Sequence, residues 1–505
     1  MKKLIGIFGC LLLPFCLLAQ KEIKEKLYSH MLGDTVYYSV IVPEDWNTKQ
    51  KLPVLYTINY GMMDGQYIAS QIHYFKSAHY SMPNTLIVNI TAAMDRIGFI
   101  YKTGMLTQTG TNFVACIKNE IIPTVEKKYN TSAFRTYIGH SYAASYANYY
   151  LQYEPEVFSG YILLAPEKVG VDYSKTNSDY AIPSPFELDE HVQKYYRKRT
   201  TLYYAAVGQF DMKRRQAYAK EIIQKLKQID STKFYAGYDS IPNGNHTNIL
   251  TTAIQPALEF IYQLYAPRIT NESALNAFEQ LTREETRLKS IYGIGLSKDY
   301  SGYSPFTQLA IKNNDTTSLL KIISHFDTDQ AKVYDIRNWA QYCFAVGLTH
   351  HAKQYYERTI KMILTNKIKN DWEVSVLNDC YHDMAVKIYK DDLVTGWRYI
   401  QKSIALVDLK NKSGGKDIDI YFDAGQFSVN NNYHVKEGLQ YLLKYEQLRH
   451  NVVDDIHWRY ESIFLNIGKG YLLLNDSVNA KTYLHKVLDI NPDNQKAKEL
   501  LAKLG

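Results

Sequence analysis

The segment Arg135-Thr136-Tyr137-Ile138-Gly139-His140-Ser141-Tyr142-Ala143-Ala144 is the most informative stretch of the chain. Its first four residues are typical of a buried strand, and a stretch rich in small and aromatic residues follows the serine as a predicted helix. A strand, a sharp turn that carries a serine, and a helix together form a nucleophile elbow. A serine on such a turn stands clear of the sheet, where a histidine can take its proton and the helix N-terminus stabilises negative charge. The segment therefore indicates that Ser141 is a nucleophile.

Two further residues could complete a catalytic triad with Ser141. Asp211 follows the predicted strand Thr201–Val207, and His246 follows the predicted strand Lys233–Gly237. Both positions are carboxyl ends of strands, where α/β sheets collect catalytic loops, and the chain order Ser, Asp, His is that of α/β hydrolases. His246 would accept the serine proton, and Asp211 would hold the imidazole in the required tautomer.

Ordinary structural roles are the alternative for these residues. A serine or an aspartate at the start of a helix is often only an N-cap, and His246 could be a polar loop residue. Two other carboxylates, Glu167 and Asp239, could replace Asp211 as the acid. We expect Glu167 to line the substrate pocket instead, and His140 is a second candidate pocket residue.

The residues around the elbow predict the fold of the first half of the chain. Short β-rich runs alternate there with amphipathic stretches, which is typical of a mostly parallel sheet covered by helices. The predicted strands are Thr35–Val42, Leu52–Ile58, Thr85–Ile90, Arg135–Ile138, Gly160–Leu164, Thr201–Val207 and Lys233–Gly237. The predicted helices are Thr111–Lys128, Ser141–Gln152, Asp211–Ile229 and Thr251–Tyr265. Together they predict a doubly wound α/β domain of the α/β-hydrolase type.

A different pattern begins after about residue 267, where strand signals fade and a short motif recurs. The motif is a small residue, two others and a tyrosine, and its copies are spaced 44, 42 and 42 residues apart. The copies are Ala352–Tyr355, Gly396–Tyr399, Gly438–Tyr441 and Ala480–Tyr483. A small residue lets two helices approach closely, and a tyrosine one turn later fills the gap between neighbouring hairpins. The pattern predicts stacked helix pairs, with an irregular helical domain as the alternative.

The last unit is the most similar to the tetratricopeptide motif. It carries Gly470-Tyr471, Ala480, Leu484 and Pro492 at fitting positions, although the repeat elsewhere is longer than the usual ~34 residues. We therefore expect tetratricopeptide-like repeats over residues 334–505, preceded by a helical linker region over residues 267–333. The α/β domain is expected to span residues 21–266.

The N-terminus has the layout of a secretory signal peptide over residues 1–20. Lys2 and Lys3 precede an apolar run from Leu4 to Leu18, and a charged stretch follows Gln20. The alternative is an uncleaved anchor, but the run of about fifteen residues falls short of the roughly twenty needed to span a bilayer. Cys10 and Cys16 interrupt the run instead of following it, which argues against a lipid anchor. We expect an exported protein, either periplasmic, envelope-associated or secreted.

Composition excludes several classes of function. The net charge of +7 is small for 505 residues and is spread in mixed-sign runs, which argues against nucleic-acid binding. After the leader, Cys116, Cys343 and Cys380 lack CxxC spacing, and the 14 histidines form no metal motif. Neither G-x-G-x-x-G after a strand nor a P-loop motif occurs, so we expect neither a metal nor a cofactor. No apolar stretch beyond residue 20 is long enough to form a transmembrane segment in the mature chain.

Residues 30–265 resemble a bacterial esterase family that includes enterobactin esterase, feruloyl esterases and S-formylglutathione esterases. The segments that carry the resemblance are Leu52–Tyr56, Asp95-Arg96, Glu120–Pro123, Tyr129, Phe134–Tyr142, Pro155–Phe158 and Asn243–His246. The resemblance implies Ser141 as nucleophile, His246 as base and Asp211 as acid. Some bacterial members are also similar in carrying a repeat tail.

The resemblance further implies an oxyanion hole. The backbone N–H of Tyr142 would be one donor, and the other would come from the loop after the strand Leu52–Ile58. In that loop Tyr60 and Gly61 are equal candidates. Asp95-Arg96 could border the pocket, although a surface ion pair is the simpler interpretation.

The sequence departs from the family just after the elbow, where Ala143 and Ala144 replace the usual glycines. An added methyl group at Ala143 would crowd the helix against the strand and could displace the serine slightly. The leading hypothesis is a serine esterase that acts on a small-molecule ester, with repeats that bind a protein or peptide partner or shape the cleft. The alternative is a weak or inactive hydrolase-fold binding protein that acts through its repeats, and the intact Ser, Asp and His argue against it.

Overall fold

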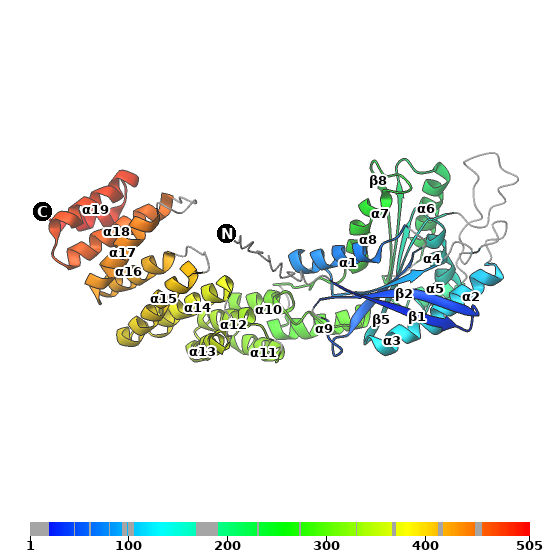
Figure 1. Cartoon of the computed structure of the whole chain (residues 1–505), viewed down its shortest axis with the longest axis horizontal. Coiled ribbons are helices and arrows are strands. Elements are labelled where there is room, and N and C mark those ends of the chain that lie inside the picture. Colours follow the sequence, from blue (N-terminus) through cyan, green and yellow to red (C-terminus); the bar gives the residue numbers. More distant parts are fainter. Residues whose placement is uncertain are drawn as a thin grey trace, which may run out of the picture. The chain divides into compact units, whose positions relative to one another are not determined.

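The computed structural model describes most of the chain outside the N-terminus. The described residues are 20–44, 46–59, 62–79, 81–92, 98, 106–167, 190–229, 232–271, 274–329, 331–365, 370–412, 418–449 and 457–505. The predicted signal peptide lies outside these residues except for Gln20. The chain forms two compact units, of which the first comprises Met1–Ile269 and Thr282–Ser297 and the second comprises Thr270–Leu281 and Lys298–Gly505 (Figure 1).

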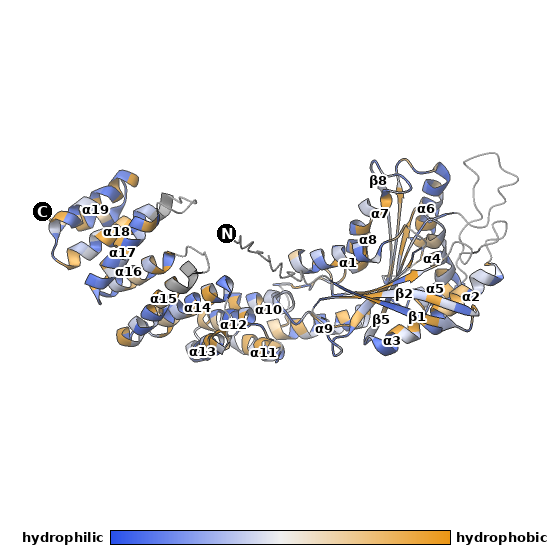
Figure 2. Cartoon of the chain, in the orientation of Figure 1, coloured by the Kyte–Doolittle hydropathy of each residue, from blue (hydrophilic) through white to orange (hydrophobic). Residues whose placement is uncertain are grey.

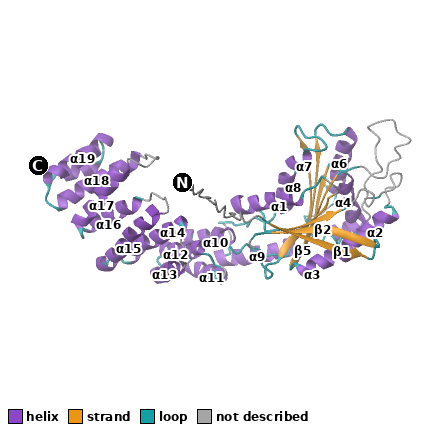
Figure 3. Ribbon diagram, viewed as in Figure 1, coloured by secondary structure: helices purple, strands orange, loops and turns teal. Residues whose placement is uncertain are grey.

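Eight strands of the first unit form one sheet in the order β1-β2-β4-β3-β5-β6-β7-β8 (Figure 3). The strands are β1 (Lys21–Ser29), β2 (Asp34–Val42), β3 (Leu52–Asn59), β4 (Leu86–Thr91), β5 (Thr131–His140), β6 (Gly160–Leu164), β7 (Thr201–Gly208) and β8 (Phe234–Ile241). The β1–β2 and β2–β4 pairs are antiparallel, whereas every pair from β4 to β8 is parallel. The mostly parallel sheet predicted from the sequence is confirmed.

The central strands are buried on both faces. All five residues of β6 and all eight of β7 are buried, which explains why these strands are continuous apolar and aromatic runs. Figure 2 shows that apolar residues are concentrated in the central strands, whereas the surrounding helices carry both apolar and polar residues.

Helices cover both faces of the sheet. On one face α1 and α8 contact each other, while α2 to α6 contribute to a single core cluster on the other face (Figure 1). These helices are α1 (Gly65–Tyr74), α2 (Gln108–Cys116), α3 (Ile122–Lys128), α4 (Tyr142–Tyr153), α5 (Glu190–Tyr196), α6 (Lys213–Leu226), α7 (Ile249–Thr252) and α8 (Ile254–Tyr262). Short π-helical segments follow α1 and α2, at Phe75–His79 and Ile117–Ile121.

Beyond α8 no strand occurs among the described residues, which form one π-helical segment at Met384–Ile388 and a series of α-helices. They are α9 (Ala277–Tyr292), α10 (Tyr300–Lys312), α11 (Thr316–Phe326), α12 (Val333–Ala345), α13 (Thr349–Thr365), α14 (Asp371–Asp383), α15 (Leu393–Lys412), α16 (Asp419–Asn431), α17 (Val435–Arg449), α18 (His457–Leu473), α19 (Ser477–Ile490) and α20 (Gln495–Ala502). The predicted all-helical second half is thereby confirmed. None of the described helices is long and apolar enough to cross a membrane.

Helices of the second unit pack as consecutive pairs, α12 with α13, α14 with α15, α16 with α17, and α18 with α19. The four copies of the small-residue motif lie on the second helix of each pair, and their small residues are buried. At Gly438 an added Cβ would lie 2.2 Å from the Ser428 Cβ, so α16 and α17 approach too closely for a side chain there. The motif thus marks helix contacts, as its composition indicates.

Candidate active site

The predicted elbow joins β5 to α4 through Ser141. The serine has φ 55° and ψ −122°, a conformation that is strained for a residue with a side chain. Its backbone N–H donates to the Leu164 carbonyl at 2.9 Å, and its own carbonyl accepts from the Ala144 N–H at 3.1 Å. These bonds hold the turn that a nucleophile elbow requires.

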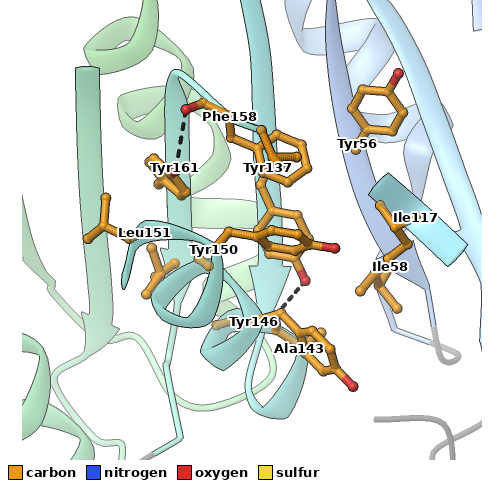
Figure 4. Close-up of a cluster of buried hydrophobic side chains, with 14 of the residues drawn as sticks. Tyr56, Ile58, Ile117, Tyr137, Ala143, Tyr146, Tyr150, Leu151, Phe158 and Tyr161 are labelled. Atoms are coloured by element: carbon orange, nitrogen blue, oxygen red, sulfur yellow. Dashed lines mark hydrogen bonds between the residues drawn. The ribbon is translucent and has the colours of Figure 1, made fainter. Parts of the chain in front are cut away.

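The close contact of β5 with α4 explains the glycine before the elbow. A Cβ on Gly139 would lie 2.5 Å from the Ala143 carbonyl oxygen, so no side chain fits there. The same carbonyl accepts a hydrogen bond of 2.6 Å from the Tyr137 hydroxyl, at the edge of a buried cluster that includes Tyr150 and Phe158 (Figure 4). Ala143 and Ala144 are both fully buried, so their methyl groups are part of this packed interface.

The structure brings the three predicted triad residues together. The His246 Nε2 lies 3.1 Å from the Ser141 Oγ, and its Nδ1 lies 3.1 Å from the Asp211 Oδ2. The residues come from the loops at the carboxyl ends of β5, β7 and β8. Only 1% of the Asp211 side chain is exposed, against 33% for His246, so the acid is shielded while the base faces solvent.

Backbone hydrogen bonds join the loop that carries Asp211 to the loop that carries His246. The Phe210 N–H donates to the Gly244 carbonyl at 2.8 Å, and the Gln209 N–H donates to the Ile241 carbonyl at 3.0 Å. A Cβ on Gly208 would lie 2.4 Å from the Gly244 carbonyl carbon. The distance between Asp211 and His246 therefore depends on close backbone packing at this glycine.

The environment of Asp211 favours its ionised form. Burial alone would raise its pKa, but hydrogen bonds from His246, from Arg215 and from the Met212 N–H outweigh burial and lower the pKa to about 2. The Arg215 Nη1 donates to Oδ1 at 2.8 Å, which leaves Oδ2 for the histidine. At neutral pH the carboxylate is thus charged and can stabilise an imidazolium.

The two other candidate acids lie elsewhere. Glu167 is buried and accepts from the Arg215 Nε at 2.7 Å and from the Arg214 Nη2 at 3.2 Å. Asp239, inside β8, accepts from the Tyr204 hydroxyl at 2.6 Å. Of the three carboxylates it is Asp211 that reaches His246, whereas Glu167 is hydrogen-bonded to Arg214 and Arg215.

His140 contacts the loop that carries His246. Its Nε2 lies 2.7 Å from the His246 backbone carbonyl, and the two imidazole rings are 4.6 Å apart. Burial lowers the pKa of His140 to about 4, so the ring is neutral at neutral pH. A carbonyl can only accept, which makes Nε2 the protonated nitrogen of His140.

Of the predicted oxyanion donors, Tyr142 lies among the described residues. Tyr142 begins α4 directly after the serine, at the position that the elbow requires for one donor. Tyr60, Gly61 and the pair Asp95-Arg96 lie outside the described residues. Within the described part of the chain, no group of three or more His, Cys, Asp or Glu side chains could hold a metal ion.

The arginines of the network were missed in the sequence. Arg214 and Arg215 follow Lys213 at the start of α6, where three consecutive cations look like a solvated helix face. Only the position of Arg215, one turn after Asp211, hints at a contact, because residues i and i+4 are neighbours on a helix.

One family model and several solved structures are similar to this chain. Residues 29–247 match the family described as "Putative esterase". An uncharacterised protein from Capnocytophaga ochracea has a similar structure, with 15% identity, a TM-score of 0.49 and coverage of 71% of this chain and 99% of that chain. The IroE-like serine hydrolase from Shewanella oneidensis has 16% identity, a TM-score of 0.42 and coverage of 61% and 98%. The siderophore hydrolase EstA from Aspergillus nidulans has 13% identity, a TM-score of 0.36 and coverage of 49% and 96%.

No curated protein sequence matches the chain. The family match covers the sheet from the end of β1 onward, with the elbow and the loops of Asp211 and His246. Over residues 29–247 the chain is therefore similar to this esterase family, which supports a hydrolase.

Proposed function

We propose that the protein hydrolyses a carboxylic ester through an acyl-enzyme intermediate on Ser141. The observation that supports this proposal best is the continuous contact from the Ser141 Oγ through both nitrogens of His246 to Asp211, with 3.1 Å at each step. This is the arrangement in which an imidazole can remove the serine proton while a carboxylate stabilises the resulting charge.

The proposed reaction has two half-reactions, the acylation and the deacylation of Ser141, and His246 transfers the proton in both. The Ser141 Oγ attacks the ester carbonyl carbon while its proton passes to the His246 Nε2. The tetrahedral intermediate collapses, the C–O bond to the alcohol breaks, and His246 returns the proton to the departing alkoxide oxygen. A water molecule then attacks the acyl-enzyme, gives its proton to His246, and the acid is released as Ser141 recovers a proton. The Tyr142 N–H and a donor from Tyr60 or Gly61 would bind the oxyanion.

The remaining parts of the chain extend the proposal. Residues 1–20 would direct export to the periplasm or cell envelope, and residues 21–266 would form the catalytic domain. Residues 267–333 would connect it to tetratricopeptide-like repeats over 334–505, which would bind a protein or peptide partner or shape the cleft. A binding protein without catalysis is the competing hypothesis, and the hydrogen bonds of the triad speak against it.

Hydrolysis of p-nitrophenyl acetate and butyrate by the purified protein tests the proposal. Ser141→Ala should lower kcat by at least about 10³-fold, because the nucleophile is lost. Ser70→Ala is the matched control, since this serine is exposed on α1 and its hydroxyl donates to the Gln66 carbonyl one turn earlier. No hydrolysis by the folded wild-type protein, or wild-type rates in Ser141→Ala, would overturn the proposal.

A further inference from the structure

One buried arginine bridges two carboxylates beside the candidate active site. The Arg215 side chain is 9% exposed, and it donates from Nη1 to the Asp211 Oδ1 at 2.8 Å and from Nε to the Glu167 Oε2 at 2.7 Å. The two carboxylates lie in different loops, after β6 and after β7. Arg215 therefore joins neighbouring strand ends through its planar fork, which a lysine could not reproduce.

The bridge fixes the carboxylate that faces the base. Asp211 uses Oδ2 for His246, while Oδ1 accepts from Arg215 and from the Met212 N–H at 2.7 Å. With one oxygen held by two donors, the carboxylate has little freedom to rotate away from the imidazole. A catalytic group that loses such support moves easily by the fraction of an ångström that matters for rate.

The other end of the bridge reaches the elbow. The Glu167 N–H donates to the Ser141 carbonyl at 3.3 Å, and the Glu167 carbonyl accepts from the Ser145 Oγ at 2.6 Å. The chain of contacts thus runs from the nucleophile turn through Glu167 and Arg215 to the acid. It connects the backbone of Ser141 with the side chain of Asp211 by a route that does not pass through His246.

We propose that Arg215 is a positioning residue that holds Asp211 in the orientation that accepts a hydrogen bond from His246, with Glu167 holding Arg215 in turn. The inference rests on the proposed function, since it assigns Asp211 and His246 their catalytic roles. Arg215 touches neither Ser141 nor, in the proposed mechanism, the substrate, so it acts through Asp211 alone.

The charges around the base give a readout that a purely structural role would not produce. His246 faces the Asp211 carboxylate, the Ser141 hydroxyl and the neutral ring of His140. Removal of the Arg215 charge makes the electrostatic potential at His246 more negative, which favours the protonated, inactive imidazole. The acidic limb of the kcat/KM profile should then move to higher pH. Removal of the Glu167 charge should move the limb to lower pH.

The experiment uses the full protein with p-nitrophenyl acetate and the variants Arg215→Met, Arg215→Lys, Glu167→Gln and the double variant Arg215→Met/Glu167→Gln. Arg215→Met should lower kcat about 10- to 100-fold with KM within about twofold of the wild-type value. The acidic limb should shift in opposite directions in the two single neutral variants. In the double variant the limb should return towards the wild-type position while kcat stays low, because the charge balance is restored but the hydrogen bond to Asp211 is not.

Arg214→Met is the matched control, because it removes the same charge from the preceding residue, which also contacts Glu167, while the Arg215 hydrogen bond to Asp211 remains. Its kcat should stay within about threefold of wild type. Arg215→Lys keeps the charge, so its limb should not move, although its kcat should fall because the fork is lost. Should Arg215→Met fail to fold, the kcat and limb of Arg215→Lys and Glu167→Gln decide the question.

Equal losses of kcat in Arg214→Met and Arg215→Met would overturn the inference, as would an unchanged kcat in Arg215→Lys or limb shifts of the same sign. A wild-type protein that neither hydrolyses the ester nor reacts with a fluorophosphonate would instead refute the proposed function. The two failures are therefore distinguishable.

Discussion

Gly208→Ala should disable the candidate triad without altering any of its residues. β7 ends at Gly208, and an added Cβ would lie 2.4 Å from the Gly244 carbonyl carbon, 2.5 Å from its oxygen and 2.7 Å from the Asn245 nitrogen. All three atoms are backbone, so they cannot rotate aside. Ordinary contact with a Cβ begins at 3.4 Å, so the loop must move by about 1 Å.

This displacement is large for the site, because His246 follows Gly244 by only two residues. The His246 Nε2 lies 3.1 Å from the Ser141 Oγ, and a further ~1 Å would break that hydrogen bond. A misplacement of about 1 Å can reduce the rate about 100-fold. We therefore expect kcat/KM for p-nitrophenyl acetate to fall about 100-fold while the protein remains folded.

Gly295→Ala provides the matched control for this measurement. It makes the same substitution in the first unit, but its Cβ would meet Glu285 Oε1 at an ordinary 3.4 Å. Steady-state rates and thermal midpoints of both variants should be compared with wild type. A folded Gly208→Ala protein whose rate lies within about threefold of wild type would refute the claim that this packing sets the triad geometry.

Three further outcomes are expected. Asp211→Asn should lower kcat by about 10⁴-fold, because an amide favours the wrong imidazole tautomer. Since the pKa of Asp211 is lowered to about 2, ionisation of this carboxyl stabilises the fold by on the order of 2 kcal/mol above about pH 4, and this contribution is lost as the pH falls from about 4 to 2. The urea-unfolding free energies of wild type and variant should therefore converge over that pH window. His140→Phe should cost about 1–3 kcal/mol in urea unfolding, since the His246 carbonyl loses its buried donor, and an unchanged free energy would contradict this assignment. Gly438→Ala should lower the thermal midpoint of the helical circular-dichroism signal by overpacking against Ser428, at a cost of about 1–3 kcal/mol, whereas a wild-type midpoint would show that the helices can separate freely.

The central strands and the elbow could be predicted because their signals are local. β6 and β7 are unbroken runs of apolar and aromatic residues, and Ser141 follows a strand and precedes a helix within a few positions. β1 was not predicted, since Lys21–Ser29 alternates charged residues with few apolar ones. It is an edge strand with one half-buried face, so it lacks the continuous apolar run that marks a buried strand.

The choice of the acid could not be made from the sequence. Asp211, Glu167 and Asp239 all lie at or near the ends of adjacent strands, and their distances to His246 depend on how far each strand extends. β8 continues to Ile241 instead of ending at Gly237 as predicted, which places Asp239 inside the strand, beside Tyr204. The role of Arg215 is similarly invisible, because a cation at a helix start is usually solvated and only tertiary structure brings Glu167 to it.

Fluorophosphonate labelling followed by mass spectrometry of peptides tests the central claim most directly. These reagents react with a serine only where a neighbouring base activates it, so the label reports the working Ser141–His246 pair and not merely its geometry. We predict one covalent adduct on the peptide that contains Ser141, and none in Ser141→Ala. A folded wild-type protein that remains unlabelled, or that carries its label on another serine, would contradict the account.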